Sequence, residues 1–154
     1  MSPSSQPVLA PTLEFMRLLW DLDSRLQSAS KTMADTLGVT GPQRLVIRMI
    51  GLYPGITASD LSSLLRLHKS TLTGVLQRLE RRRTIRRTAD KDDRRVSHFE
   101  LTTEGQRINR HRLGTIEARL GEALGGLPEA DVAAARRVLI TLADAIGGVD
   151  GRER

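Results

Sequence analysis

The chain has 154 residues and a formal net charge of +6, with 39% hydrophobic and 27% charged residues. This length and composition predict one globular domain with its own core. The absence of cysteine excludes disulfides, thiolate metal sites and redox sensing through a thiol. No apolar run approaches the ~18 residues of a membrane span, and residues 1–11 lack the charged start of a signal peptide. We therefore expect a cytoplasmic protein without a membrane partner, with disordered tails at residues 1–11 and 148–154.

Helical periodicity dominates the first third of the chain. Apolar residues recur there at spacings of three and four, which predicts a helix over residues 12–37 that Gly38 ends. Its seven turns exceed what one small core needs, so we expect this helix to pack on a partner as well. The sequence Thr-Gly-Pro at 40–42 opens a second helix, which Pro-Gly at 54–55 ends.

Residues 57–101 have the pattern of a winged helix-turn-helix. Residues 57–60 resemble a capping box with aspartate in place of glutamate and begin a short helix. After a turn at 66–68, a second helix is predicted over residues 70–82, and short β-strands over 85–89 and 96–101 flank a charged hairpin tip. The inward side chains of the second helix are Leu72, Val75, Leu76 and Leu79.

Two further helices complete the predicted order α-α-α-α-β-β-α-α. Thr102 is the expected N-cap of a long helix that reaches Leu124, and a Gly-Gly pair at 125–126 breaks it. A last helix begins at Pro128 and ends before residue 148. The predicted fold class is mainly α with a small β-hairpin wing, in which a winged helix-turn-helix at residues 40–101 lies between long helices.

The excess positive charge is concentrated in residues 66–95. This segment holds eleven Lys and Arg against four acids, a net charge of +7, so the other 124 residues sum to −1. A localised basic segment on a helix-turn-helix pattern is typical of a protein that binds double-stranded DNA.

The outward face of the helix at 70–82 carries candidate DNA contacts, because hydroxyl, amide and basic groups bond base edges and phosphates. Gly74 would let the backbone approach the duplex closely, and the first turn would enter the major groove. The alternative is an ordinary solvated helix face. The other candidate contacts on this face are Lys69, Ser70, Thr71, Thr73, Gln77, Arg78 and Arg81.

At the hairpin tip, carboxylates adjoin arginines. A carboxylate bonded to a guanidinium fixes the direction of that arginine and leaves a neighbouring arginine for the minor groove. The alternative is a solvated turn with compensating charges. The candidate DNA contacts here and on the preceding strand are Arg86, Lys91, Asp93, Arg94 and Arg95.

Residues 93–105 match the pattern D-x-R-x(5)-L-T-x-x-G, the signature of the MarR family of bacterial transcription regulators. Residues 56–61 and 69–73 are similar to that family's helix-turn-helix. The resemblance extends from about residue 12 to residue 146. It implies a homodimer in which helices 12–37 and 102–147 form the dimerisation region, each recognition helix enters a major groove and each wing enters the flanking minor groove. By position, Arg95 is the wing arginine and Asp93 its orienting partner.

One position departs from the family pattern. Arg83 stands where the family usually has glycine after the recognition helix. A left-handed conformation there costs a residue with a Cβ about 1 kcal/mol or more. Either Arg83 bears that strain or the turn is built differently.

The resemblance also implies a small, often aromatic or anionic, effector bound between the dimerisation region and the DNA-binding lobe. The alternative is that the residues lining this crevice are plain core or dimer contacts. The expected lining residues are Met16, Trp20, Arg48, Met49, Tyr53 and His111.

The resemblance and the residues together favour a homodimeric repressor that binds a pseudo-palindromic operator and is released by a small ligand. The alternative function is a winged-helix dimer that binds a protein partner and has only non-specific DNA affinity. The three histidines lack metal-ligand spacing, and no nucleophile–base pair stands at an interpretable spacing. We therefore expect no metal, no cofactor and no enzymatic activity.

Overall fold

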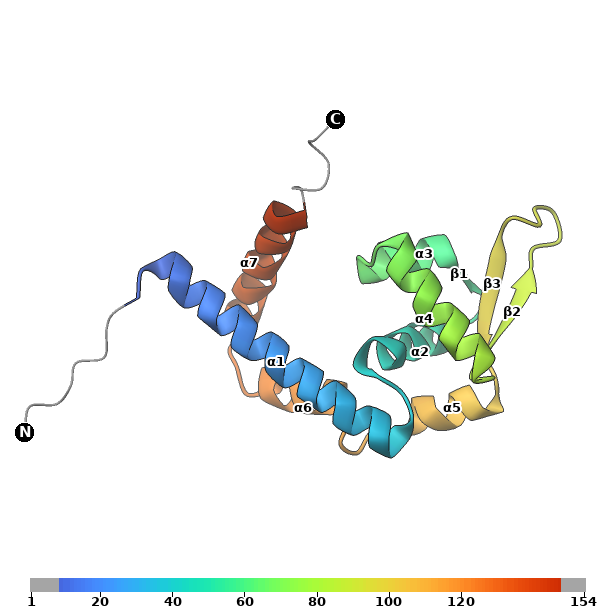
Figure 1. The fold of residues 1–154 in the computed structure, drawn as a ribbon, viewed down its shortest axis with the longest axis horizontal. Helices are drawn as coiled ribbons and strands as arrows, with labels where there is room; N and C mark the ends of the chain where they lie inside the picture. The colour runs from blue at the N-terminus through green and yellow to red at the C-terminus, as the bar shows by residue number, and fades with distance from the viewer. Residues whose placement is uncertain (1–8, 148–154) are drawn as a thin grey trace, which may run out of the picture. The chain divides into compact units, whose positions relative to one another are not determined.

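The structure is a computed structural model that describes residues 9–147, and these fold into seven helices and three short strands (Figure 1). The described residues divide into two compact units, one ending at Ile116 and the other beginning at Glu117. The two predicted tails lie largely outside the described residues. Pro11, which is predicted to lie in the first tail, already belongs to a helix, because proline is well tolerated in a first turn.

Helix α1 (Pro11–Leu37) contributes to the core only through its last two turns. Met33 and Leu37 are buried, whereas Phe15, Leu22 and Leu26 lie on an exposed apolar stripe. Gly38 ends the helix at φ 79°, and its N–H donates to the Ala34 carbonyl. The predicted glycine stop is therefore confirmed, and most of the apolar stripe has no cover in the single chain.

Helix α2 (Gly41–Leu52) forms the centre of the first unit. Thr40 and Gln43 make a reciprocal capping box, in which each side chain accepts from the other residue's backbone N–H. Its inward face packs against α4 (Lys69–Arg81), which in turn packs against α3 (Ala58–Leu65). The buried apolar residues of these three helices are Val46, Ile47, Ile50, Leu61, Leu72, Val75, Leu76 and Leu79.

A three-stranded antiparallel sheet carries the wing. Strand β3 (Ser97–Leu101) lies between β1 (Ile56–Thr57) and β2 (Ile85–Ala89). Phe99, which opposes Ile56 on one side and Arg87 on the other, is 2% exposed and fills the inner face. The bounds predicted for β2 are confirmed, and β3 begins one residue later than predicted. Strand β1 was not predicted, since two residues are too few to show an alternating pattern.

The helix predicted from Thr102 to Leu124 is wrong: it is two helices, α5 (Thr103–Arg110) and α6 (Ile116–Gly125). The buried side chain of Arg44, 1% exposed, donates to the backbone carbonyls of Ile108, Asn109 and His111. These bonds satisfy carbonyls that a continuing helix would have used. Gly114 then adopts φ 72°, which interrupts the helix further.

The second unit begins at Glu117, the second residue of α6, and also contains the whole of α7 (Glu129–Gly147). No residue of this unit is buried within residues 117–147. Its larger apolar side chains are exposed, among them Leu120, Leu124, Leu139 and Ile146. This unit therefore has apolar faces but no core of its own.

Candidate nucleic-acid interface

The turn between α3 and α4 is built by backbone geometry and by a histidine cap. Arg66 adopts a left-handed conformation with φ 52°, and Ser62 bonds Leu67 through both its carbonyl and its hydroxyl. The His68 Nδ1 atom lies 2.9 Å from the Ser70 hydroxyl and accepts from the Ser70 N–H. Helix α4 therefore begins at Lys69, one residue earlier than predicted, because His68 serves as its N-cap.

Helix α4 separates an apolar face from a polar one. The four apolar residues predicted to face inward are all buried, which confirms the orientation of the helix. Gly74 has no atom within 4 Å of the place where a Cβ would stand, so the backbone is open to a partner there. The Thr73 hydroxyl donates to the Lys69 carbonyl at 2.7 Å and keeps its acceptor capacity. The exposed side chains of this face are Lys69, Ser70, Thr71, Thr73, Gln77, Arg78 and Arg81.

Arg83 adopts the left-handed conformation, with φ 55°. Its N–H donates to the Glu80 carbonyl at 2.8 Å, and the Thr84 N–H donates to the Leu79 carbonyl at 3.0 Å. This bond pair is the Schellman motif that normally ends with glycine. Of the two alternatives at this position, the first holds: the turn has the usual geometry and Arg83 bears the strain.

The peptide of Thr84 joins the end of α4 to the wing and to α5. Its carbonyl accepts from the Thr102 N–H and hydroxyl, both at 3.1 Å, and the Thr84 hydroxyl donates back to Leu79. Gly105 lies against the same carbonyl so closely that a Cβ would overlap the Thr84 oxygen. The L-T-x-x-G pattern thus has a physical cause: threonine bonds this carbonyl, and glycine leaves room for it.

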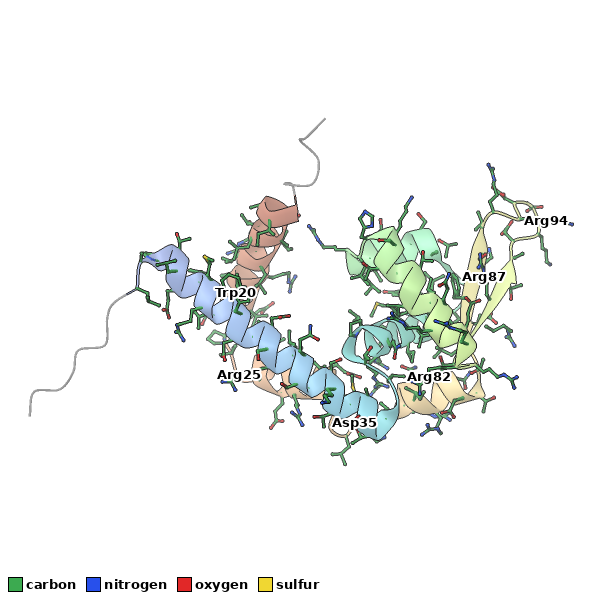
Figure 2. The ribbon with its side chains drawn as sticks, viewed as in Figure 1. Trp20, Arg25, Asp35, Arg82, Arg87 and Arg94 are labelled. Carbon is green, nitrogen blue, oxygen red and sulfur yellow. The ribbon has the colours of Figure 1, made fainter. Side chains whose placement is uncertain are left out.

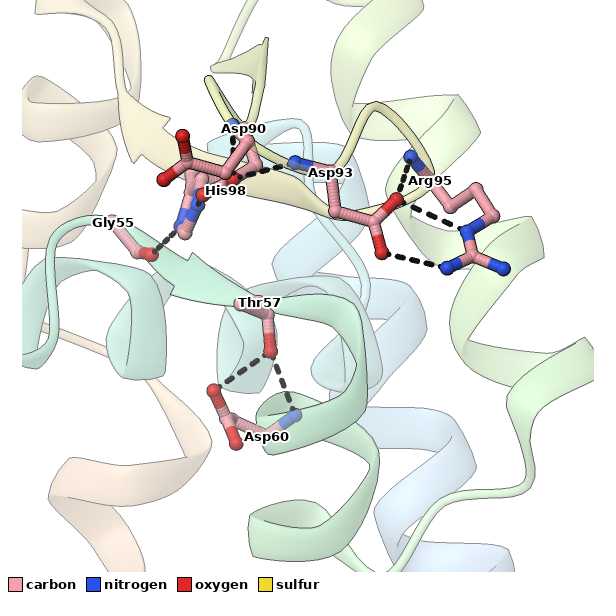
Figure 3. Close-up of polar contacts among 8 residues, drawn as sticks. Gly55, Thr57, Asp60, Asp90, Asp93, Arg95 and His98 are labelled. Carbon is pink, nitrogen blue, oxygen red and sulfur yellow. Dashed lines mark hydrogen bonds and ion pairs between the residues drawn. The ribbon is translucent and has the colours of Figure 1, made fainter.

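The wing tip holds an oriented arginine (Figure 3). The Arg95 Nε and Nη2 atoms donate to the two carboxylate oxygens of Asp93 at 3.0 Å each, and the Arg95 N–H donates to Oδ1. These bonds lower the pKa of Asp93 and raise that of Arg95. The Arg95 side chain remains 90% exposed. Arg94 and Lys91 are also exposed, and Figure 2 shows Arg94 at the tip of the hairpin.

The outer face of the sheet contains a polar group that the sequence did not reveal. The His98 ring lies between the Gly55 carbonyl, 2.7 Å from Nδ1, and the Asp90 carboxylate, 2.8 Å from Nε2. The bond from His98 and two backbone N–H bonds lower the pKa of Asp90 to about 2. The only signal in the sequence is strand alternation, which places residue 98 on the face opposite Phe99.

Arg86, a predicted DNA contact, has a partner within the sheet. Its Nη2 atom lies 2.6 Å from Glu100, the residue opposite it on β3. The neighbouring Arg87 donates to the Ser97 hydroxyl at 2.8 Å. Both arginines are exposed, so the sheet presents positive groups whose positions its own side chains fix.

The residues predicted to line an effector crevice do not meet within the single chain. Trp20 is 63% exposed on the part of α1 that extends away from α2 (Figure 2). It lies thirteen residues, about 20 Å of helix, before the first buried residue of α1. Met16 is exposed one turn earlier, whereas Arg48, Met49 and Tyr53 lie on or just after α2 and His111 follows α5.

Two of these residues have local polar partners instead. Arg48 donates to the Asn109 side chain at 2.8 Å, and the His111 Nε2 atom lies 2.9 Å from the Leu113 carbonyl. A groove of about 440 Å³ lies elsewhere in the first unit, and none of the predicted ligand residues lines it. Its lining residues are Ile50, Gly51, Pro54, Arg86, Glu100, Leu101, Gln106, Asn109 and Arg110.

Residues 9–147 contain no cluster of three or more carboxylates and histidines that could hold a metal ion. Within the same range, no helix combines the length and the apolar character needed to cross a bilayer.

Comparison with known proteins identifies the fold and the family. The model of the MarR family matches residues 39–97, which comprise α2, the helix-turn-helix and the wing up to the first residue of β3. The transcriptional repressor MdtR of Bacillus subtilis is 27% identical over 124 residues, 80% of each chain. Matches to other curated regulators are shorter, and this chain spans only 52–60% of their length.

Two solved structures are similar over most of the chain. The regulator PcaV of Streptomyces coelicolor, solved with its natural ligand, is 27% identical, with a TM-score of 0.72 over 92% of this chain and 99% of PcaV. FabT of Streptococcus pneumoniae, solved with DNA, is 26% identical, with a TM-score of 0.58 over 88% of this chain and 99% of FabT. With the signature at residues 93–105 and the winged helix-turn-helix geometry, these matches make the chain a member of the MarR family of transcription regulators.

Proposed function

We propose that this protein is a sequence-specific DNA-binding transcription regulator that acts as a homodimeric repressor. One observation carries the proposal: the exposed polar face of α4 and the oriented arginine of the wing belong to the same segment of net charge +7. A protein that binds DNA with both a recognition helix and a wing needs positive charge at these two places. FabT, a relative solved with DNA, supports this assignment.

In this proposal the first turn of α4 enters the major groove. Ser70, Thr71 and Thr73 then read base edges, and the open backbone at Gly74 allows close approach. Gln77 continues the same face, while Lys69, Arg78 and Arg81 contact phosphates. Because phosphate contacts release counterions, operator affinity falls steeply with salt, by a log–log slope of about −0.9 for each neutralised phosphate.

The wing contributes the second contact. Asp93 holds the Arg95 guanidinium through two bonds, which reduces the conformational freedom that the arginine loses on entering the minor groove. Arg94, Lys91 and Arg86 then lie close to the flanking phosphates. Asp93 acts by orienting Arg95, since a carboxylate itself would repel phosphate.

The exposed apolar stripes support a homodimer. Phe15, Leu22 and Leu26 on α1 are exposed, and residues 117–147 bury no side chain. Apolar faces of this extent are typical of helices that a partner covers. A second copy of the chain is the proposed partner, and its two-fold symmetry requires a pseudo-palindromic operator.

We further propose that a small aromatic or anionic ligand relieves repression. PcaV, a relative of similar length, was solved with its natural ligand. Met16 and Trp20 lie too far along α1 to share a site with Arg48, Met49, Tyr53 and His111 of the same chain. The proposed pocket therefore combines groups from two chains. DNA binding would place the protein in the cytoplasm, where bacterial chromosomal DNA lies.

The test is a selection from random duplexes by the full-length protein at about 0.15 M salt. We expect a two-fold-symmetric motif with half-sites about one helical turn apart. The alternative function, a dimer that binds a protein partner, predicts that selected and random duplexes bind within a few-fold of each other. Failure to enrich any symmetric motif would refute the proposed function.

A further inference from the structure

The His98 imidazole joins two parts of the fold that are distant in sequence. Its Nδ1 atom lies 2.7 Å from the carbonyl of Gly55, in the turn before β1, and its Nε2 atom lies 2.8 Å from Asp90, which follows β2. Gly55 is itself attached to the sheet, because its N–H donates to the Phe99 carbonyl at 2.9 Å. The ring therefore connects the start of the hairpin tip to the entry of the helix-turn-helix (Figure 3).

Both partners of the ring are hydrogen-bond acceptors. A neutral imidazole has one N–H and one lone pair, whereas an imidazolium has two N–H donors. The pair of contacts is therefore complete only when His98 is protonated. The neutral ring must lose one contact or place a lone pair against an oxygen.

The charges around the ring agree with this requirement. Asp90 and, at longer range, Asp60 of α3 both raise the pKa of His98. Glu100 and Arg86, which share the outer face of the sheet with His98, are paired with each other. The β-sheet partners of His98 are Thr57 on β1 and Thr88 on β2, neither of which is ionisable at neutral pH.

Asp90 extends this connection to the wing tip. While its Oδ2 atom contacts His98, its Oδ1 atom accepts from the backbone N–H groups of Asp92 and Asp93 at 2.8 and 3.0 Å. The Asp93 side chain in turn holds Arg95 through two bonds at 3.0 Å. One continuous series of hydrogen bonds therefore runs from Gly55 to the wing arginine.

We propose that His98 is a positioning residue for DNA binding: as an imidazolium it fastens Asp90, and with it the wing tip, to the turn before the helix-turn-helix. Protonation of His98 thus orders the wing and strengthens operator binding. This proposal rests on the proposed function, in which Arg95 enters the minor groove. Loss of one ring contact on deprotonation should weaken operator binding about two- to tenfold, the range expected for one hydrogen bond.

The first test needs no DNA. In the full-length protein, nuclear magnetic resonance follows the His98 ring and the amides of Asp92 and Asp93 from pH 5.5 to 8.5. Their exchange protection, corrected for the intrinsic pH dependence of exchange, should fall as His98 loses its proton. In Asp90→Asn the trend should reverse, because the asparagine amide can donate to a neutral Nε2. Protection that is independent of pH in both proteins would overturn the proposal.

The second test measures affinity for the palindromic duplex recovered by selection, at constant ionic strength over the same pH range. The wild type should bind two- to tenfold more weakly above the pKa of His98 than below it. His98→Gln should lose the part of the pH profile that His98 contributes and bind, below the pKa of His98, about as weakly as the deprotonated wild type. Equal pH profiles for the two proteins would overturn this inference but leave the proposed function intact. Absence of specific binding by the wild type at any pH would instead refute the proposed function, and with it this inference.

Discussion

Gly105→Ala is expected to destabilise the protein by about 1–3 kcal/mol. A Cβ at this buried position would overlap the Thr84 carbonyl oxygen and press on Leu101. Moving the start of α5 to relieve the overlap costs about 1–3 kcal/mol, as overpacking usually does. The bond from the Thr102 N–H to the same carbonyl would be lost, at about 1 kcal/mol, whereas the Thr102 hydroxyl keeps its 2.6 Å bond to the Arg83 carbonyl. The better helix propensity of alanine returns up to about 1 kcal/mol.

The assay is urea unfolding followed by circular dichroism, with wild type and variant at equal concentration because a dimer's stability depends on it. The matched control is Gly74→Ala, where the new Cβ meets no atom within 4 Å in the middle of α4. The control should gain about 1 kcal/mol of stability. If Gly105→Ala unfolds within 0.5 kcal/mol of the wild type, the tight packing at Thr84 is refuted.

Four further predictions follow from contacts in the first unit. Arg83→Gly should stabilise the protein by up to about 1 kcal/mol in the same unfolding assay, because glycine adopts the left-handed conformation of this position without the strain that a Cβ causes. A clear loss of stability would contradict the strain at Arg83. Arg44→Met should cost about 3 kcal/mol or more, because it removes two hydrogen bonds from a charged donor to the carbonyls of Ile108 and His111 at the end of α5; an unchanged unfolding midpoint would contradict the capping role. Arg95→Ala should weaken operator binding about tenfold or more without lowering stability. The control Arg25→Ala removes an exposed arginine that is paired with Asp21 on α1, and this variant should bind the operator as the wild type does. Equal losses of affinity in both variants would argue against a wing contact. Asp90 stabilises the fold above its unfolded-state pKa of 3.8 and loses this effect as the pH falls through about 2. His98 stabilises the fold below its unfolded-state pKa of 6.5 and loses this effect as the pH rises through its raised folded-state pKa. The difference in stability between the wild type and His98→Gln should therefore be largest between about pH 4 and 6.5.

Regular patterns in the sequence predicted the helices and the wing. The inward residues of α4 repeat with helical spacing, and the strand at Ile85–Ala89 is bounded by a turn on each side. Strong turn signals worked equally well: Gly38 ends α1, and the departure at residue 83 marked the position that is strained.

Contacts between distant residues were not predictable in this way. The break between α5 and α6 depends on Arg44, which lies more than sixty positions earlier in the chain. The bond between His98 and Gly55 likewise requires the pairing of β1 with β3, and β1 is too short to show a pattern. The effector pocket stays a prediction, because the residues expected to line it do not meet within the single chain.

The junction at Thr84 has a consequence for how such a protein can be regulated. The end of the recognition helix, the base of the wing and the start of α5 all bond or pack on this one peptide. A displacement of α5 would therefore move the recognition helix and the wing together as one rigid body. In a dimer, a ligand that displaces α5 would change the distance between the two recognition helices and leave each winged helix-turn-helix itself unaltered. Induction would then appear as a mismatch with the spacing of the half-sites, and an operator with altered spacing would restore binding.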